Sequence, residues 1–357
     1  MERLARVHFR VIRINRWSLA LAVVILLALL LLPSGGLMPT LAGSAHVVQQ
    51  GVTISTRDGT RDFSGKTEQE ARAMLLEMEA GFTAPPVDAQ EAHLANGTSY
   101  VIPELNGYAL DVDATWTRLA AAPANTRLEP ATRVHTPTRR LSDYPQSVIR
   151  QGNPDKQAVG ILINVDWGKE YLPSMLATLK KRGAHATFFV SGRWAKDNPT
   201  LVKMMFDNGH EIASHGYDLS QGPSALARAG KLKADIAKST ETIQAITGAP
   251  VKYYAPHMSE VDPTILKTAA DLKLRTVLYS LDTIDWQDPA PETIVARVKN
   301  AMAGDLILMH PKANTAKALD TVLVGFQGKG LTPLTLSEML SPEPSSATTA
   351  WMTRDNH

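Results

Sequence analysis

Five segments of the chain each place a titratable side chain at or just past the end of an apolar run. They carry Asp166, His215, His257, the pair Asp282 and Asp285, and His310. Carboxylates and imidazoles transfer protons in general acid–base catalysis, and they also bind metal ions. If the segments meet on one face of the fold, we predict a pocket suited to acid–base or metal-assisted hydrolysis. A histidine taken singly is more often structural, so this prediction depends on the five segments together.

The run Ile161-Leu162-Ile163-Asn164-Val165, which ends at Asp166, is typical of a buried strand in a parallel sheet. Side chains at the carboxyl ends of such strands face the ligand crevice. Asp166 is therefore expected where chemistry takes place. The alternative is a solvated carboxylate at the end of a strand.

Apolar runs alternate with helical patterns throughout residues 158–340. Strands are expected at 159–165, 187–191, 274–279 and 305–309. Helices are expected at 171–181, 199–206, 225–246, 263–270 and 292–301. This alternation predicts an α/β fold with a parallel sheet, either open or closed into a barrel.

The N-terminal residues 1–45 combine a basic flank with an aliphatic block from Leu19 to Leu32. This order is typical of a signal peptide or a membrane anchor, and residues 17–33 would enter a bacterial-type membrane. Because the block is shorter than the ~20 residues that span a bilayer comfortably, both alternatives stay open. In either case we expect an exported protein, anchored on the extracytoplasmic side of the membrane or secreted.

Local composition predicts the character of three further regions of the chain. Residues 46–122 predict a small α+β domain, in which Thr67 and Glu70 form a capping box at the start of a helix. Residues 123–157 are rich in proline, with Pro123, Pro130, Pro137 and Pro145, and predict an extended linker. Residues 341–357 have no hydrophobic period and predict a disordered tail.

The composition excludes several classes of function. The chain has no cysteine, so disulfides, thiolate metal sites and a cysteine nucleophile are excluded. The net charge of +2 gives no support to a nucleic-acid partner.

The region 158–340 resembles the polysaccharide deacetylase family, also described as the NodB-homology or carbohydrate esterase 4 family. The resemblance rests on the segments HATFFVSGRW, NGHEIASH, LDTIDW and LILMHP. It implies a distorted (β/α) barrel that hydrolyses the acetamide C–N bond of N-acetylated sugars, in peptidoglycan or a related glycan, with a divalent metal, usually zinc. The small domain loosely resembles domains that bind peptidoglycan in cell-wall enzymes, and a spacer role is the alternative.

The resemblance also implies roles for individual residues. Asp166 stands at the position of the base and His310 at that of the acid, with Asp285 as the partner of its imidazole. His215 stands at the position of a metal ligand, and Asp282 opens the intact D-x-x-D-W motif. The residues expected to line the sugar groove are Trp286, Tyr254 and His257.

Two departures from the family pattern affect the metal. Trp167 replaces the metal-binding aspartate, and Leu219 replaces the second metal-binding histidine. Zinc sites usually have at least three protein ligands, so the family's zinc centre is expected to be absent or rebuilt. A rebuilt site would combine His215 with donors from a neighbouring set: Asp166, Asp218, Glu170 or His257.

Two functions therefore stay open at this point. One is an active deacetylase with Asp166 as base and His310 as acid. The other is a catalytically inactive homologue that binds or scaffolds cell-wall glycan. A purely structural module would leave the polar strand ends without a role.

Overall fold

The structure, a computed structural model, describes residues 46–56, 58–93 and 98–343. The predicted signal or anchor in residues 1–45 and most of the predicted tail lie outside the described residues. Within the described ranges, no helix has the length and apolarity needed to span a membrane.

The central element is a curled, open parallel sheet, a half-barrel of the α/β type. Its strands follow the order β13-β12-β11-β10-β9-β15-β14, and β16 pairs with the start of β9. In the described part of the chain β13 and β14 are not paired with each other, so the sheet is not closed. The strands are β9 (Ala158–Val165), β10 (Thr187–Val190), β11 (Glu211–Ser214), β12 (Tyr253–Tyr254), β13 (Arg275–Thr276), β14 (Leu281–Asp282), β15 (Leu306–Met309) and β16 (Thr332–Leu334).

Strand β9 is the longest strand of the sheet, and it pairs with three others, β10, β15 and β16. Its residues alternate between two cores. Ile161 and Ile163 pack toward the surrounding helices, and Leu162 packs toward the inside of the half-barrel. Because both faces are covered, the strand is apolar almost throughout, which is why its sequence predicted it correctly.

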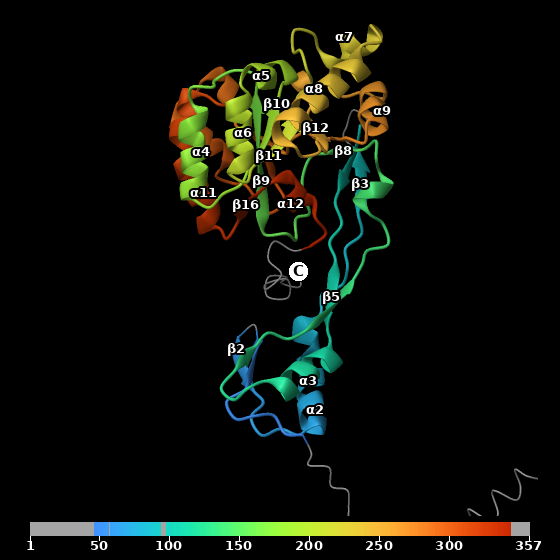
Figure 1. The fold of residues 1–357 in the computed structure, drawn as a ribbon, viewed down its shortest axis with the longest axis vertical. Coiled ribbons are helices and arrows are strands. Elements are labelled where there is room, and N and C mark those ends of the chain that lie inside the picture. The colour runs from blue at the N-terminus through green and yellow to red at the C-terminus, as the bar shows by residue number, and fades with distance from the viewer. Residues whose placement is uncertain (1–45, 57, 94–97, 344–357) are drawn as a thin grey trace, which may run out of the picture. The chain divides into compact units, whose positions relative to one another are not determined.

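Helices cover the outer face of the sheet, with α4, α6 and α11 beside β9, β10 and β11 (Figure 1). The helices are α4 (Leu172–Lys181), α5 (Gly192–Asp197), α6 (Pro199–Asp207), α7 (Pro223–Arg228), α8 (Leu232–Thr247), α9 (Pro263–Asp271), α10 (Pro291–Val298), α11 (Ala313–Gly328) and α12 (Leu336–Leu340). The single helix predicted at 225–246 is divided into α7 and α8. Gly230 has a φ of +69° at the break, a conformation that favours glycine and ends a helix.

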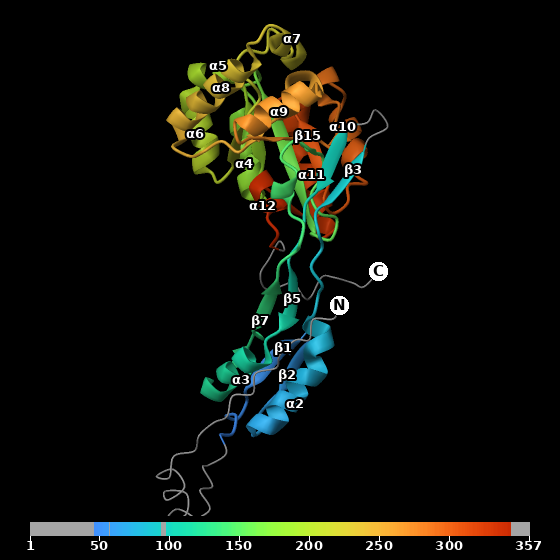
Figure 2. The ribbon, with the colours of Figure 1, turned by 90° about the vertical axis from the view of Figure 1, so that its right-hand side faces the viewer.

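The small N-terminal region has its own core, in which helices α2 and α3 pack with β1 (Figure 2). The predicted capping box is present at the start of α2, where the Thr67 amide donates to Glu70 Oε2 at 2.9 Å. The elements of residues 46–122 are β1 (Thr53–Thr56), β2 (Gly59–Asp62), α2 (Glu68–Met78), η1 (Glu79–Phe82), β3 (Gln90–His93), β4 (Ser99–Ile102), β5 (Gly107–Leu110) and α3 (Val112–Ala121). Strands β3 and β4 pair with each other, and Val101 of β4 packs in the same core as Leu162 of the half-barrel.

The segment predicted as an extended linker, 123–157, instead contains paired strands. These are β6 (Arg127–Leu128), which pairs with β1, β7 (Thr132–His135), which pairs with β5, and β8 (Val148–Ile149), which pairs with β4. The prolines lie outside these strands, at positions where no ladder hydrogen bond is needed from a backbone N–H. The prediction missed that short strands fit between the prolines.

The same segment contacts the half-barrel next to two strands, β13 and β15. The Leu278 amide donates to the Ile149 carbonyl at 2.8 Å, just beyond β13. The Gly152 amide donates to the Gly304 carbonyl at 2.7 Å, just before β15. Residues 149–152 therefore lie against chain segments that follow β13 and precede β15.

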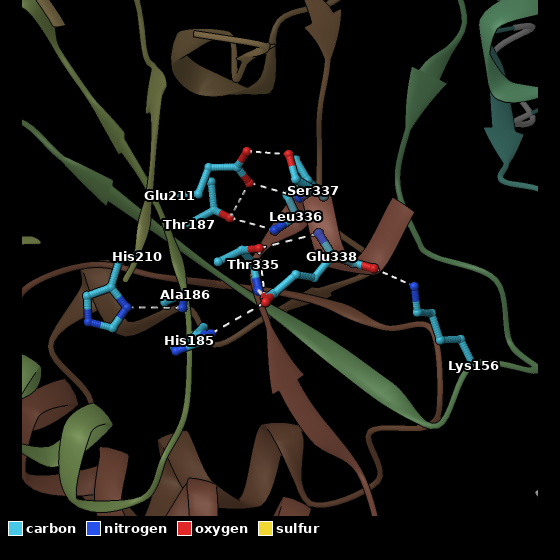
Figure 3. Close-up of polar contacts among 10 residues, drawn as sticks. All are labelled: Lys156, His185, Ala186, Thr187, His210, Glu211, Thr335, Leu336, Ser337 and Glu338. Carbon is cyan, nitrogen blue, oxygen red and sulfur yellow. Dashed lines mark hydrogen bonds and ion pairs between the residues drawn. The ribbon is translucent and has the colours of Figure 1, made fainter. Parts of the chain in front are cut away.

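A polar network lies at the amino end of the sheet (Figure 3). The Glu211 carboxylate accepts from Thr187 Oγ1 at 3.2 Å and from the Ser337 amide at 2.9 Å, which joins two strand starts to helix α12. Lys156 donates to the carbonyls of Glu338 and Ser341 at the end of that helix. Burial lowers the pKa of Lys156 to about 8. The network holds α12 across the inside of the half-barrel.

The first residues of the predicted tail are fixed in place. The Asn106 amide donates to the Pro342 carbonyl at 2.9 Å, and Asn106 Nδ2 donates to Glu343 Oε1 at 2.8 Å. The part of the prediction that covers 344–357 lies outside the described residues.

Candidate functional site

A cavity of about 480 Å³ lies at the carboxyl ends of the strands, where the sequence predicted the site. The lining residues come from the ends of β9, β11, β14 and β15 and from the turn after β12. They are Asn164, Val165, Asp166, Trp167, His215, Leu219, His257, Met258, Ser259, Tyr279, Asp282, Trp286, Leu308 and His310. Asp166, His215, His257, Asp282 and His310, from five separate segments, therefore share one cavity, as parallel topology requires.

The side chain of Asp166 is fixed by a hydrogen bond from the residue that follows the neighbouring strand, β10. Ser191 follows β10 directly, and its hydroxyl donates to Asp166 Oδ1. Strands β9 and β10 pair up to Val165 and Val190, so the two polar residues come out of the sheet side by side. The arrangement fixes one carboxylate oxygen and leaves Oδ2 for the cavity.

His215 is buried at the base of the cavity. Its Nδ1 donates to the Ala255 carbonyl at 2.7 Å, because a carbonyl oxygen can only accept. Burial lowers the pKa of His215 to about 3, so the ring is neutral and its Nε2 is an acceptor. Burial also lowers the pKa of His257, whose ring lies edge-on to His215 at a centroid distance of 5.7 Å.

The pair Asp285 and His310 is fully assembled. His310 Nδ1 and the His310 amide both donate to the Asp285 carboxylate, each at 2.7 Å. Thr315 in α11 donates a third hydrogen bond to the same carboxylate at 2.7 Å. Asp285 is 1% exposed, so all its partners are needed to compensate a buried charge. The arrangement fixes the orientation of the imidazole and its tautomer, as the resemblance implied.

Trp167 lies against one face of the His310 ring. The two rings are stacked, with centroids 5.7 Å apart and an interplanar angle of 10°. The Lys312 ammonium lies 5.7 Å from the indole centroid. Trp167 is 42% exposed, so it forms both a wall of the cavity and a part of its rim.

The residues present do not fit a zinc centre. Nowhere in the described ranges do three His, Asp or Glu side chains come together in a group that could hold a metal ion. Structural and catalytic zinc sites need at least three protein ligands. Trp167 and Leu219, at the two replaced positions, line the cavity and offer no donor to a metal.

Four residues named from the sequence do not line the cavity, and one of them, Asp285, contacts His310 instead. Glu170 is exposed on the turn after β9, and Asp218 accepts from the Ser220 amide and lies 3.4 Å from Arg193. Neither joins His215 in a rebuilt metal site. Tyr254 is buried against α8 and α9, on the opposite side of β12 from Tyr253, because successive residues of a strand alternate in direction. The prediction that Tyr254 lines the groove was therefore wrong.

Sequence reasoning also missed several contributors to the site. Ser191 could have been found, because it follows a buried strand as Asp166 does. Met258, Ser259 and Tyr279 come from irregular turns, and Thr315 comes from the first turn of α11. No spacing in the sequence pointed to these four positions.

Comparison with known proteins identifies the fold. Residues 151–277 match the family model described as polysaccharide deacetylase. Over 205 residues, the chain is 33% identical to a peptidoglycan-N-acetylglucosamine deacetylase of Bacillus cereus, covering 94% of that protein and 55% of this chain. The chain belongs to the polysaccharide deacetylase family. The family prediction made from the motifs is confirmed.

Another similar protein is the uncharacterised protein YlxY of Bacillus subtilis. It is 36% identical over 205 residues, which are 57% of this chain. The chain covers 64% of the length of YlxY, slightly less than two thirds.

Among solved structures, a CE4 family pseudoenzyme from Bacillus anthracis matches with a TM-score of 0.65 and 28% identity, over 76% of this chain and 95% of that one. A mutant of that pseudoenzyme with restored enzymatic activity matches with the same TM-score and 27% identity, over 76% of this chain and 98% of that one. The predicted deacetylase region, 158–340, is only about half of this chain. The match therefore includes part of the small N-terminal region as well as the polysaccharide deacetylase fold.

Proposed function

We propose that this chain is a catalytically silent member of the polysaccharide deacetylase family that binds cell-wall glycan. The observation that carries the proposal is the content of the cavity. Trp167 and Leu219 stand at two metal-ligand positions, and the described residues hold no group of three metal donors. Without a metal, nothing at this position lowers the pKa of a water or polarises an acetamide carbonyl.

The relatives support both parts of the proposal. A pseudoenzyme is among the similar solved structures, and it matches over most of its own length. The Bacillus cereus relative is a peptidoglycan-N-acetylglucosamine deacetylase, which supports peptidoglycan as the ligand.

The cavity retains the features of a sugar-binding site. Its volume of about 480 Å³ lies in the range of small-molecule pockets. Trp167 and Trp286 are 42% and 51% exposed on its wall, and aromatic faces of this kind pack against the apolar C–H face of a pyranose ring. Asp166 and Asp282 supply acceptors for sugar hydroxyl groups.

A binding titration with tryptophan fluorescence as the signal tests the proposal. Oligomers prepared from peptidoglycan glycan should bind saturably in the presence of a chelator, and they should release no acetate. Trp286→Ala should weaken binding by about fivefold, since one aromatic contact contributes about 1 kcal/mol. The exposed Met204→Ala, which is far from the cavity lining, serves as the control. Absence of any binding would overturn the proposal.

The second candidate is an active deacetylase, and one observation favours it. The Asp285–His310 pair is assembled with every hydrogen bond that an acid catalyst needs, and Asp166 is retained beside it. Acetate release from N-acetylglucosamine oligomers, tested with a series of divalent metals, decides between the two candidates. Release that disappears in both Asp166→Asn and His310→Ala would establish the enzyme and contradict the silent homologue.

We further propose that the chain acts outside the cytoplasm. The support is the order of a basic flank and an aliphatic block within residues 1–45. Protease treatment of intact cells that express a C-terminally tagged chain should digest the protein. Resistance in intact cells, with digestion after lysis, would contradict export.

A further inference from the structure

We propose that the cavity selects deacetylated glycan, whose glucosamine residues carry a free ammonium group in place of the acetamide. The inference rests on the proposed function, because it assigns a ligand class to the same cavity. A family member of this kind would recognise the product of deacetylation rather than its substrate. The argument depends on the charge, the hydrogen-bonding roles and the aromatic surface of the lining residues.

The cavity is acidic. Two carboxylates, Asp166 and Asp282, line it, and among the residues that the structure describes no lysine or arginine does so. Each carboxylate has Oδ1 fixed by the protein, by the Ser191 hydroxyl in one case and by the Ile284 amide at 2.8 Å in the other. In the part of the chain that the structure describes, Oδ2 of each residue accepts no hydrogen bond from the protein.

Lys312 does not compensate these carboxylates. Its ammonium lies near the Trp167 ring, but it donates to the Trp286 carbonyl at 3.0 Å and lies 3.9 Å from Asp288. Trp286 lines the cavity, but Lys312 binds its backbone carbonyl. Asp288 is not among the residues that line the cavity. Two carboxylates in a partly enclosed cavity are stabilised by a nearby positive charge. We therefore infer that the ligand supplies this charge.

One imidazole adds an acceptor. The buried His215 uses its Nδ1–H on the Ala255 carbonyl, so the other nitrogen of its ring accepts. An acetamide carbonyl needs a donor, whereas an ammonium group offers three donors. The lining groups with a fixed role therefore match an amine better than an acetamide.

The aromatic wall favours the same ligand. Trp286 is 51% exposed at the cavity, and a tryptophan face attracts cations through its quadrupole. The hydroxyl groups of Ser259 and Tyr279 can donate or accept, so they fit either form of the sugar. The preference for the amine thus comes from the two carboxylates, His215 and Trp286.

Calorimetric titration with two matched tetrasaccharides tests the inference. One is the β-1,4-linked tetramer of N-acetylglucosamine, and the other is the same tetramer fully deacetylated, at a slightly acidic pH where its amines are protonated. We expect the deacetylated tetramer to bind at least tenfold more tightly, which corresponds to about 1.4 kcal/mol. Asp166→Asn and Asp282→Asn should each reduce this ratio at least threefold. Asp207→Asn, an exposed carboxylate on α6, should leave the ratio unchanged.

The outcomes separate this inference from the proposed function. Equal or tighter binding of the acetylated tetramer overturns the inference and leaves a glycan-binding function standing. A preference that survives in both cavity variants is a general charge effect and also overturns the inference. Failure of both tetramers to bind overturns the proposed function with it. Thermal unfolding of each variant establishes that a loss of binding is not a loss of fold.

Discussion

Trp167 stacks on His310 in the wall of the cavity, with ring centroids 5.7 Å apart and planes inclined by 10°. The two residues follow β9 and β15, which are adjacent and parallel, so their side chains emerge at the same edge of the sheet. The indole thus lies beside the imidazole that stands at the acid position. A residue at a metal-ligand position of the family has become part of an aromatic wall.

Restoring donors at the two replaced positions should create a metal site. We expect the double variant Trp167→Asp with Leu219→His to bind about one zinc ion per chain, because it provides three ligands together with His215. The zinc content after dialysis against a zinc buffer measures this. The matched control, Trp167→Ala with Leu219→Ala, removes the same bulk and should bind no zinc. Equal zinc in both double variants would show that the metal binds elsewhere.

Removing the Asp285 carboxylate should destabilise the fold strongly. Asp285→Ala leaves the His310 amide, His310 Nδ1 and the Thr315 hydroxyl without their acceptor. We expect the free energy of unfolding to fall by about 3 kcal/mol. Thr315→Val removes only one of these bonds and should cost about 1 kcal/mol. Urea unfolding of both variants measures the difference, and equal costs would contradict the central role of the carboxylate.

The polar network at the amino end of the sheet should contribute stability without contributing to binding. Glu211→Gln replaces a carboxylate that accepts from Thr187 and Ser337. The expected loss is about 1–2 kcal/mol of unfolding free energy, with glycan affinity unchanged, because the cavity lies at the other end of the strands. Glu241→Gln, on an exposed position of α8, is the control. A loss of affinity in Glu211→Gln would show that the two ends of the sheet are coupled.

His210 should make the fold sensitive to acid. It is 3% exposed, its Nδ1 accepts from the Ala186 amide, and its Nε2 has no partner in the described part of the chain. Burial lowers its pKa to about 4, whereas a histidine in the unfolded chain has a pKa of about 6.5. Between these values the unfolded chain binds the extra proton. Stability should therefore fall as the pH falls from about 6.5 to about 4, by about 3 kcal/mol in total from this residue.

Unfolding free energies measured across this pH range test the assignment. His210→Gln cannot titrate, so its stability should change less steeply with pH than that of the natural chain. Identical slopes in the two proteins would assign the acid sensitivity to other groups.

The sequence predicted correctly the cavity residues that directly follow apolar strands. Asp166 and His310 lie where the buried runs of β9 and β15 end, and the runs are recognisable because both faces of the sheet are covered. Strand β12 has only two residues, so no alternation was visible, and Tyr254 was assigned to the wrong side. The direction of a side chain in so short a strand is set by tertiary packing alone.

The linker prediction failed for a related reason. Strands β6, β7 and β8 have two to four residues each, too few to show a period between the prolines. Their pairing partners, β1, β5 and β4, lie far back along the chain. The local composition of a segment does not show which distant strands it pairs with, so these strands could not be predicted from it.

Binding of peptidoglycan-derived oligomers with and without metal tests the central claim most directly. The account predicts that the dissociation constant measured in a chelator equals that measured in zinc to within about twofold, since no metal takes part in binding. Binding that appears only when zinc is added, and disappears in His215→Ala, would contradict the account and establish a metal centre in this cavity.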